Sequence, residues 1–313
     1  MKIFFQFLSF SLLIMQCTSV KTPTAETITK LQSVEETSDI LFTLASDDMK
    51  GRDMLNGGYD MAADYVKTYF KSHGIAPFLS SGYDDNFILN EMSAYNIVGR
   101  LGKYDPKKPT VLIGAHLDHI GINTGSTDSI YNGANDNASG STAVLQIAKV
   151  LSNYKWDQNI IIALFAAEEK GLLGAKHLAE KLKEDGVELQ MMINFEMIGK
   201  TLTTGANQVY MTGFKLSDFS DKINQFAPNF VTFLPEAEGY NLFKRSDNYA
   251  FYETFKVPCH TLSSFDFKNY EYYHKAEDEF EKMDIANMNQ IIRTATFAIG
   301  QMLRTKTTAT MRD

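Results

Sequence analysis

Short apolar runs of strand length alternate with helical patterns along this chain, and that alternation constrains the fold more than any other feature. The runs are rich in Ile and Val and cover residues 111–115, 160–165, 191–195 and 257–262. Apolar residues recur at helical spacing in 61–73, 143–152, 172–184 and a last helix capped by Asp284. Strands that alternate with helices indicate a largely parallel sheet covered on both faces. We therefore predict one α/β domain, a three-layer α/β/α sandwich with a mostly parallel, mixed central sheet.

The charge balance limits the partners of the chain. It carries 38 acidic and 30 basic side chains, so its formal net charge is 30 − 38 = −8. Binding to nucleic acid depends on clustered Lys and Arg, so we expect no nucleic-acid partner. Hydrophobic residues make up 44% of the chain, which indicates a globular protein rather than a disordered one. The two cysteines, Cys17 and Cys259, exclude a disulfide framework.

The first residues have the features of an export signal. Met1 and Lys2 precede an apolar run, 3–15, that is too short to span a bilayer. Gln16 and Cys17 follow, and this order resembles a bacterial lipoprotein cleavage box. Such a box usually has a small residue at the position of Gln16. An ordinary cleaved signal and an uncleaved anchor therefore remain as alternatives.

This reading divides the chain into three parts. We predict a lipoprotein-type signal peptide in 1–16 with Cys17 as the lipid acceptor, a tether in 17–27, and one folded domain in 28–305. The protein would then be exported and lipid-anchored in the cell envelope, or otherwise periplasmic or secreted. The oligomeric state stays open.

Side chains that bind metals follow the predicted strands, at the points where the strands end. In chain order they are His116, Asp118 and His119, then Asp136, then Glu168 and Glu169, then Glu196, then Tyr273 and His274. In open α/β sheets, ligands bind beyond the carboxyl ends of the strands, so residues from several strands can converge there. Histidine nitrogens and carboxylate oxygens are ligands that zinc accepts. The inventory suits two zinc ions.

The order of these motifs resembles the dizinc exopeptidases typified by secreted bacterial leucyl aminopeptidases and aminopeptidase Y. The matching blocks are residues 114–119, 133–140, 168–174, 194–199 and 273–274. Weaker likeness extends from Gly51-Arg52 to the last helix. The resemblance implies a zinc exopeptidase domain that releases N-terminal residues from peptide substrates.

The resemblance also implies a metal ligand for each strand end. His116 and Glu196 would hold one zinc ion, and Glu169 and His274 would hold the other. Asp136 would bridge the two ions, because a shared carboxylate reduces their mutual repulsion.

Three further residues receive catalytic roles from the resemblance. Glu168 would be the general base that takes a proton from the attacking water. Asp118 would accept the second ring N–H of His116 and so fix its tautomer. Tyr273 would donate its hydroxyl to the oxyanion of the tetrahedral intermediate. His119 could line the same cleft.

Two departures from the family pattern leave the specificity open. Glu196 stands where aminopeptidases of this family usually have Asp, although related carboxypeptidases use Glu there. Asn248 stands where the family often has His, while Asp247 keeps its match. The preferred N-terminal residue is therefore not predicted. Two alternatives are a glutaminyl-peptide cyclotransferase, which uses one zinc ion, and a non-catalytic binding protein on the same scaffold.

Overall fold

The computed structural model describes residues 22–89, 91–125 and 128–312 of the chain. The predicted signal peptide, 1–16, and most of the predicted tether lie outside these residues. Among the described helices, none combines the length and the apolar character that crossing a membrane requires.

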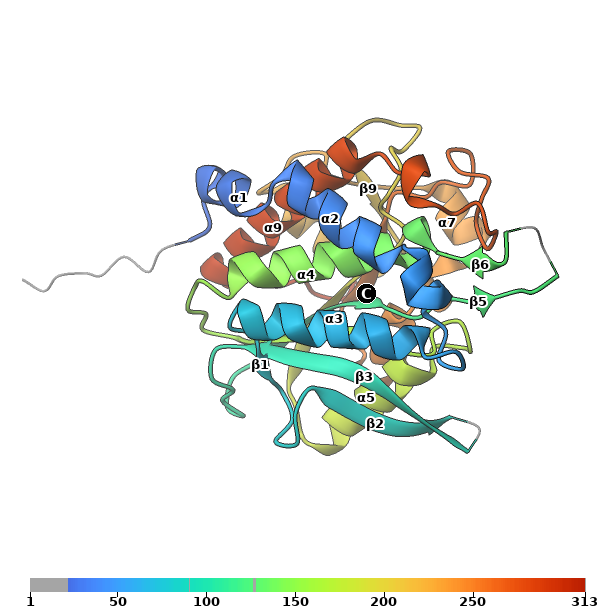
Figure 1. Ribbon diagram of the computed structural model, residues 1–313. Helices are drawn as coiled ribbons and strands as arrows, with labels where there is room; N and C mark the ends of the chain where they lie inside the picture. The colour runs from blue at the N-terminus through green and yellow to red at the C-terminus, as the bar shows by residue number, and fades with distance from the viewer. Residues whose placement is uncertain (1–21, 90, 126–127, 313) are drawn as a thin grey trace, which may run out of the picture.

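The centre of the fold is a nine-stranded sheet whose middle strands are parallel (Figure 1). Strand β4 (Thr110–His116) lies between β7 (Asn159–Phe165) and β8 (Leu189–Phe195) and is parallel to both. Strand β11 (Cys259–Ser263) continues the parallel order beside β8. These four strands correspond to the four apolar runs, so the predicted mostly parallel sheet is confirmed.

Antiparallel strands extend the sheet on both sides of this parallel centre. Strand β3 is antiparallel to β7 and also pairs with β1 and β2, while β9 is antiparallel to β11 and parallel to β10. A separate hairpin pairs β5 with β6. The bounds are β1 Ala76–Pro77, β2 Asp84–Leu89, β3 Met92–Leu101, β5 Gly121–Ile122, β6 Ile130–Tyr131, β9 Val209–Met211 and β10 Val231–Thr232. The sheet is therefore mixed, as predicted.

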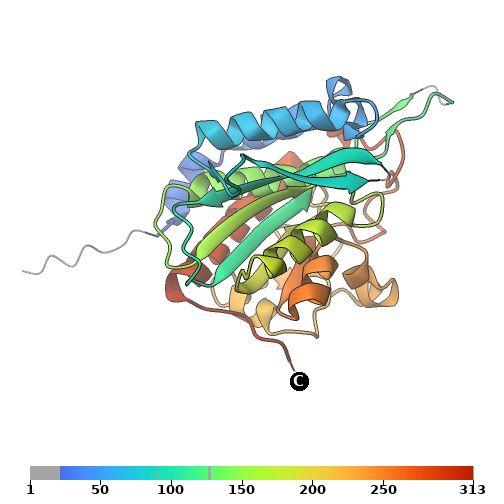
Figure 2. The same ribbon diagram turned by 90° about the horizontal axis from the view of Figure 1, so that it is seen from below.

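Helices cover both faces of the sheet, as Figure 2 shows for α3 above and α5 below. One face carries α1 (Ala25–Leu31), α2 (Val34–Leu44), α3 (Gly58–Ser72), α4 (Gly140–Leu151) and α9 (Ile285–Thr305). The opposite face carries α5 (Leu173–Glu184), which contacts α8 (Asn248–Phe255). Shorter helices are α6 (Phe219–Asn224), α7 (Pro235–Gly239), η1 (Asp47–Arg52), η2 (Ala134–Ser139), η3 (Leu242–Lys244) and η4 (Phe280–Lys282).

Two hydrophobic cores fill the spaces between these three layers. Alternate residues of β4 enter them: Val111 and Ile113 pack into the core beneath α4, and Leu112 packs into the core beneath α5. All three are fully buried, and burying one such side chain contributes about 1.5–3 kcal/mol. Because both faces of the parallel strands are buried, their sequences are continuous apolar runs.

The described chain extends slightly past the predicted domain bounds of 28–305. Helix α1 begins at Ala25, within the predicted tether. After α9, the backbone N–H of Thr310 donates to Asp218 at 2.6 Å, and Met311 forms a β-bridge with Ser217. Both ends of the described chain therefore contact the folded domain, and the exact bounds stay a prediction.

Candidate active site

The predicted site residues lie at the carboxyl ends of the four central strands. His116 is the last residue of β4, Glu168 and Glu169 follow β7, and Glu196 follows β8. His274 lies in the long loop after β11, and Asp136 lies in η2 between β4 and α4. Neighbouring parallel strands end at the same edge, so residues far apart in the sequence meet there.

Asp136 occupies the middle of the group. Its Oδ1 lies 3.3 Å from His116 Nε2, and its Oδ2 lies 3.1 Å from His274 Nε2. His274 Nε2 also lies 3.3 Å from Glu169 Oε1. Each oxygen of one buried carboxylate thus faces a different histidine, which is the arrangement expected of a bridging ligand.

The hydrogen bonding of His116 supports a cation at this position. Its Nδ1 lies 3.1 Å from the backbone oxygen of Asp118, so this nitrogen carries the ring hydrogen. Its buried Nε2 has no hydrogen-bond partner among the described residues, and in the neutral ring it is an acceptor that faces the Asp136 carboxylate. A cation between the two acceptors resolves this conflict. Ligand atoms about 2.0–2.2 Å from a tetrahedral zinc ion lie about 3.3–3.6 Å apart, close to the 3.3 Å between His116 Nε2 and Asp136 Oδ1.

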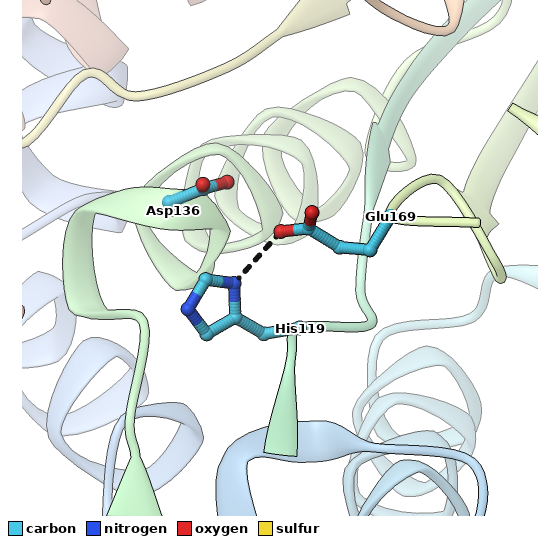
Figure 3. A group of neighbouring side chains, drawn as sticks. All are labelled: His119, Asp136 and Glu169. Carbon is cyan, nitrogen blue, oxygen red and sulfur yellow. Dashed lines mark hydrogen bonds and ion pairs between the residues drawn. The ribbon is translucent and has the colours of Figure 1, made fainter. Parts of the chain in front are cut away.

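His119 belongs to the same group, although it received no metal role from the sequence. Its Nδ1 lies 3.0 Å from Glu169 Oε1, as Figure 3 shows. Ligand atoms of His119, Asp136 and Glu169 lie within 4.8 Å of one another. The signal in the sequence was a second histidine directly after Asp118, in the block that already supplies His116.

Asp118 contacts different atoms from those expected. Its Oδ1 is 3.9 Å from His116 Nδ1, which instead bonds the backbone oxygen of Asp118. The Asp118 carboxylate accepts the backbone N–H groups of Glu168, at 3.1 Å, and Glu169, at 3.3 Å. Asp118 therefore orients the turn that carries both glutamates, and fixes the His116 tautomer through its main chain.

Glu196 lies beside this group but forms no ion pair with a histidine among the described residues. Its Oε2 accepts the hydroxyl of Ser246. Burial raises the pKa of Glu196 to about 7, against the opposing effect of His116. The extra methylene of Glu relative to Asp lets the carboxylate reach Ser246.

Glu168 and Asp247 are the other carboxyls in this region. Burial raises the pKa of each well above its usual range, against the opposing effect of His116. Neither oxygen of Asp247 has a hydrogen-bond partner among the described residues. The site therefore concentrates acidic groups that a metal ion would stabilise in the charged form.

Tyr273 lies at the outer side of the site. Its ring stacks on His274, with ring centroids 4.0 Å apart, and 36% of the residue is exposed. Burial of the rest raises the pKa of Tyr273 above its usual value, so the hydroxyl keeps its proton and can donate it.

Arg52 holds the loop that carries Asp136, so Gly51-Arg52 makes a structural loop contact, but the sequence did not indicate which loop. It is fully buried, and its guanidinium donates to the backbone oxygens of Leu44, Leu117, Asn132, Gly133 and Asp136. Burial lowers the pKa of Arg52 to about 10, which still leaves it protonated at neutral pH. The likeness at Gly51-Arg52 was the only signal in the sequence.

Asp278 holds the same loop from the other side. Its Oδ1 accepts the backbone N–H of Asn135 at 2.8 Å, and its Oδ2 accepts that of Asp136 at 3.0 Å. The hydroxyl of Tyr270 also donates to Oδ1. We call Arg52 and Asp278 the loop clamp, because one binds the carbonyl groups and the other binds the N–H groups of the Asp136 loop.

Asn248 has a structural role. Its Nδ2 donates to the backbone oxygens of Phe243 and Cys259, and its Oδ1 accepts the hydroxyl of Thr261. These bonds tie the start of α8 to β11. Every polar group of the Asn248 amide is thus engaged within the fold.

Comparison with sequences gives partial matches to known proteins, two of which serve as examples. A probable zinc metalloprotease of Pyrenophora tritici-repentis is 35% identical over 125 residues, which is 40% of this chain and 29% of that protein. Leucine aminopeptidase 2 of Trichophyton equinum is 35% identical over 124 residues, which is 39% of this chain and 23% of that protein. The chain therefore spans less than a third of either relative.

Comparison with solved structures, and with a family profile, extends the likeness to most of the fold. The Legionella pneumophila LapA aminopeptidase superposes with a TM-score of 0.68 at 18% identity, covering 93% of this chain and 78% of that one. Porphyromonas gingivalis glutaminyl cyclase gives 0.65 at 16% identity, covering 87% and 99%. Identities this low support the three-layer fold alone. The profile of peptidase family M28 matches residues 96–299, which is more than half of the chain, and the chain therefore belongs to peptidase family M28.

Proposed function

We propose that this protein is an aminopeptidase that holds two zinc ions and removes single N-terminal residues from peptides. The observation that carries the proposal is the Asp136 carboxylate, whose two oxygens face His116 and His274 separately. Membership of a peptidase family and the names of the relatives support the reaction class.

The five predicted ligands divide into two sets around Asp136. His116 and Glu196 would hold one ion, and Glu169 and His274 would hold the other, with Asp136 shared. Bound zinc would polarise the scissile carbonyl group and lower the pKa of the attacking water.

The remaining residues move or hold protons and orient groups. A carboxylate oxygen of Glu168 would take the proton of the attacking water and return it to the nitrogen of the leaving amine. The Asp118 carboxylate fixes the backbone on which Glu168 and Glu169 stand. The Tyr273 hydroxyl would donate to the carbonyl oxygen as negative charge develops there.

His119 would act on Glu169 rather than on the substrate. Its Nδ1–H would donate to Glu169 Oε1, because the bond between them spans 3.0 Å and both groups are largely buried. A hydrogen bond of this kind sets the direction of a ligand's lone pairs and is worth about 10–100-fold in metal affinity.

Two other functions remain as alternatives. A glutaminyl-peptide cyclotransferase would use one zinc ion and release ammonia, and the likeness to such an enzyme is one of fold. A non-catalytic binding protein would be expected to lack ligands or the base, but every predicted ligand and Glu168 is present at the sheet edge. The five predicted ligands would suffice for two ions, and this favours the aminopeptidase.

The test is the product that the zinc-loaded protein forms from a peptide library. Mass spectrometry should show the loss of one N-terminal residue, and N-acetylated peptides should resist cleavage. A product lighter by about 17 Da, the mass of the ammonia that cyclisation releases, would indicate the cyclotransferase. Removal of C-terminal residues from an N-acetylated peptide would contradict the aminopeptidase assignment and leave the dizinc mechanism intact.

We also propose that the protein is exported and lipid-anchored through Cys17. The support is the charged start, the short apolar run and the cysteine that follows it. Mass spectrometry of the mature N-terminus should show a diacylated Cys17, and Cys17→Ala should abolish membrane fractionation. A mature protein that begins elsewhere would contradict the lipid anchor.

A further inference from the structure

A pocket opens beside Glu196, and Asp136 is not among its lining residues. Its inner wall is buried and carries hydroxyl groups, among them Tyr210 and Thr212, each 3% exposed. Its rim is exposed and includes Arg245, Phe267 and Tyr273. Because Glu196 and Tyr273 line the pocket, a group bound there would lie next to the proposed scissile bond.

Thr212 brings an unused hydrogen-bond donor to the inner wall. Its Oγ1 accepts the backbone N–H of Thr261 at 3.1 Å, but its own hydroxyl hydrogen meets no acceptor within the described chain. A buried donor without an acceptor costs free energy until a ligand supplies one. The neighbouring hydroxyls of Ser246 and Ser263 are already engaged as donors, to Glu196 and to the backbone oxygen of Met197.

Arg245 brings a second unused donor to the rim. Its guanidinium forms no hydrogen bond or ion pair with any residue that the structure describes, and it is the one cationic side chain in the lining. Glu196 is the one acidic side chain there, and its charge would be matched by the metal ion that it is proposed to hold. The pocket therefore offers an incoming side chain hydrogen-bond donors that have no acceptor among the described residues, one of them cationic.

Apolar side chains line the same pocket as these donors. Phe265 and Phe267 lie with ring centroids 4.5 Å apart, and Phe265 and Tyr273 stack at 5.6 Å. These rings, with Met197 and Leu242, can bury the methylene groups of a side chain. The combination of apolar walls with polar donors suits a side chain that has an aliphatic stem and an acceptor at its end.

We infer that this pocket binds the side chain of the N-terminal residue and favours one that ends in a carboxylate, glutamate before aspartate. The inference rests on the proposed aminopeptidase function. A carboxylate accepts hydrogen bonds only, so it can use Thr212 and Arg245 without leaving a donor of its own unpaired. Arginine and carboxylate groups also form charge-assisted hydrogen bonds, which are stronger than neutral ones.

The test compares peptides that differ only in their N-terminal residue, Glu, Gln or Leu, with the zinc-loaded enzyme. We expect a higher kcat/KM for Glu than for Leu. Arg245→Gln should lower the Glu-to-Leu ratio of kcat/KM by about tenfold, because it removes a charge-assisted bond. Thr212→Val should lower the same ratio by about three- to tenfold while keeping the shape of the residue.

Lys244→Gln is the matched control for loss of one positive charge. Lys244 is the neighbour of Arg245 but lies in another groove, with its Nζ 5.8 Å from the Tyr249 ring centroid. The Glu-to-Leu ratio of kcat/KM in the Lys244→Gln variant should equal that of the wild type. Calorimetry with free glutamate and free leucine gives a second readout, in which glutamate should bind more tightly and Arg245→Gln should remove the difference.

Each result decides the inference. A wild-type preference for Leu that Arg245→Gln and Thr212→Val leave unchanged would overturn it, while cleavage of the Leu peptide would leave the aminopeptidase function standing. A ratio that falls equally in Lys244→Gln would mean that general surface charge sets the preference, and would also overturn it. Failure to release any N-terminal residue, or conversion of the Gln peptide with loss of ammonia, would overturn the proposed function itself.

Discussion

The two halves of the candidate metal centre are held in different ways. In the half formed by Glu169 and His274, Glu169 Oε1 lies 3.3 Å from His274 Nε2 and 3.0 Å from His119 Nδ1. In the half formed by His116 and Glu196, the carboxylate makes no described ion pair and is held by Ser246 instead. Asp136 is common to both.

The two halves differ in the contacts that hold their ligands in place before a metal binds. The Glu169 half is assembled by direct contacts among the ligands and one additional histidine. The Glu196 half depends on a longer side chain held by one hydroxyl and on a fully buried histidine, which the fold cannot easily move. We therefore expect the two ions to bind with different affinities, the Glu169 half being the tighter.

Replacing Asp136 should disable both halves of the metal centre. Asp136→Ala should lose both zinc ions, because both histidines would lose their shared carboxylate, and turnover should fall by more than about 10³-fold. Metal analysis after gel filtration checks this, with Asp157→Ala, at a surface ion pair with Lys306, as the control. Retention of one ion at full occupancy would count against a bridging role.

Replacing the proposed base, Glu168, should stop the reaction but leave zinc binding in both halves unchanged. Glu168→Gln should lower kcat by about 10²–10⁴-fold, because the amide cannot accept a proton, while zinc content stays that of the wild type. Steady-state kinetics and metal analysis on the same sample check this. Activity above a tenth of the wild-type value would rule out Glu168 as the base.

Removing His119 should affect one half only. His119→Ala should weaken one zinc site by about 10–100-fold, because Glu169 loses the donor that directs it, and leave the other unchanged. A competition titration with a chelator resolves the two affinities. His177→Ala, which removes a histidine stacked on Phe87 far from the ligands, is the control. Equal weakening of both sites would contradict the division into halves.

Shortening Glu196 should have the smallest effect of these substitutions. It should act on the half formed by His116 and Glu196. Glu196→Asp should retain both ions but weaken one site by about tenfold, because the shorter arm loses its bond to Ser246. The peptide products should still lack one N-terminal residue. Glu180→Asp on the surface of α5 controls for the substitution itself. A tighter site in Glu196→Asp would show that the longer arm is a disadvantage for metal binding.

The sequence predicted the parallel centre of the sheet and most of the residues at its edge. Strands β4 and β8 contain continuous apolar runs because both of their faces are buried, and a polar residue follows each run, His116 in β4 and Glu196 after β8. Strands β1 and β10 escaped prediction because two residues are too few to form a pattern. Strand β3 begins with two exposed residues and contains Asn96 and Arg100, so it gave no continuous apolar run either.

The loop that Arg52 binds, and the role of Asp278, escaped prediction for a different reason. Arg52 and Asp278 bind backbone groups of the Asp136 loop, and a backbone contact leaves no pattern in the side chains of its partner. Only the folded chain brings residue 52 next to residue 136. The ligands themselves were predictable, because zinc requires particular side chains and the strand ends put them in order.

The position of Arg52 bears on the size of the smallest unit that can work. The segment matched by the family profile begins at residue 96, so it does not include Arg52, which supports the loop of the proposed bridging carboxylate. A chain trimmed to that segment would leave the backbone oxygens of Leu117, Asn132, Gly133 and Asp136 without the Arg52 donor, and each buried group left unsatisfied costs about 1–3 kcal/mol. The segment that the family profile matches is therefore shorter than the segment that a stable active site needs. The N-terminal helices belong to the longer segment.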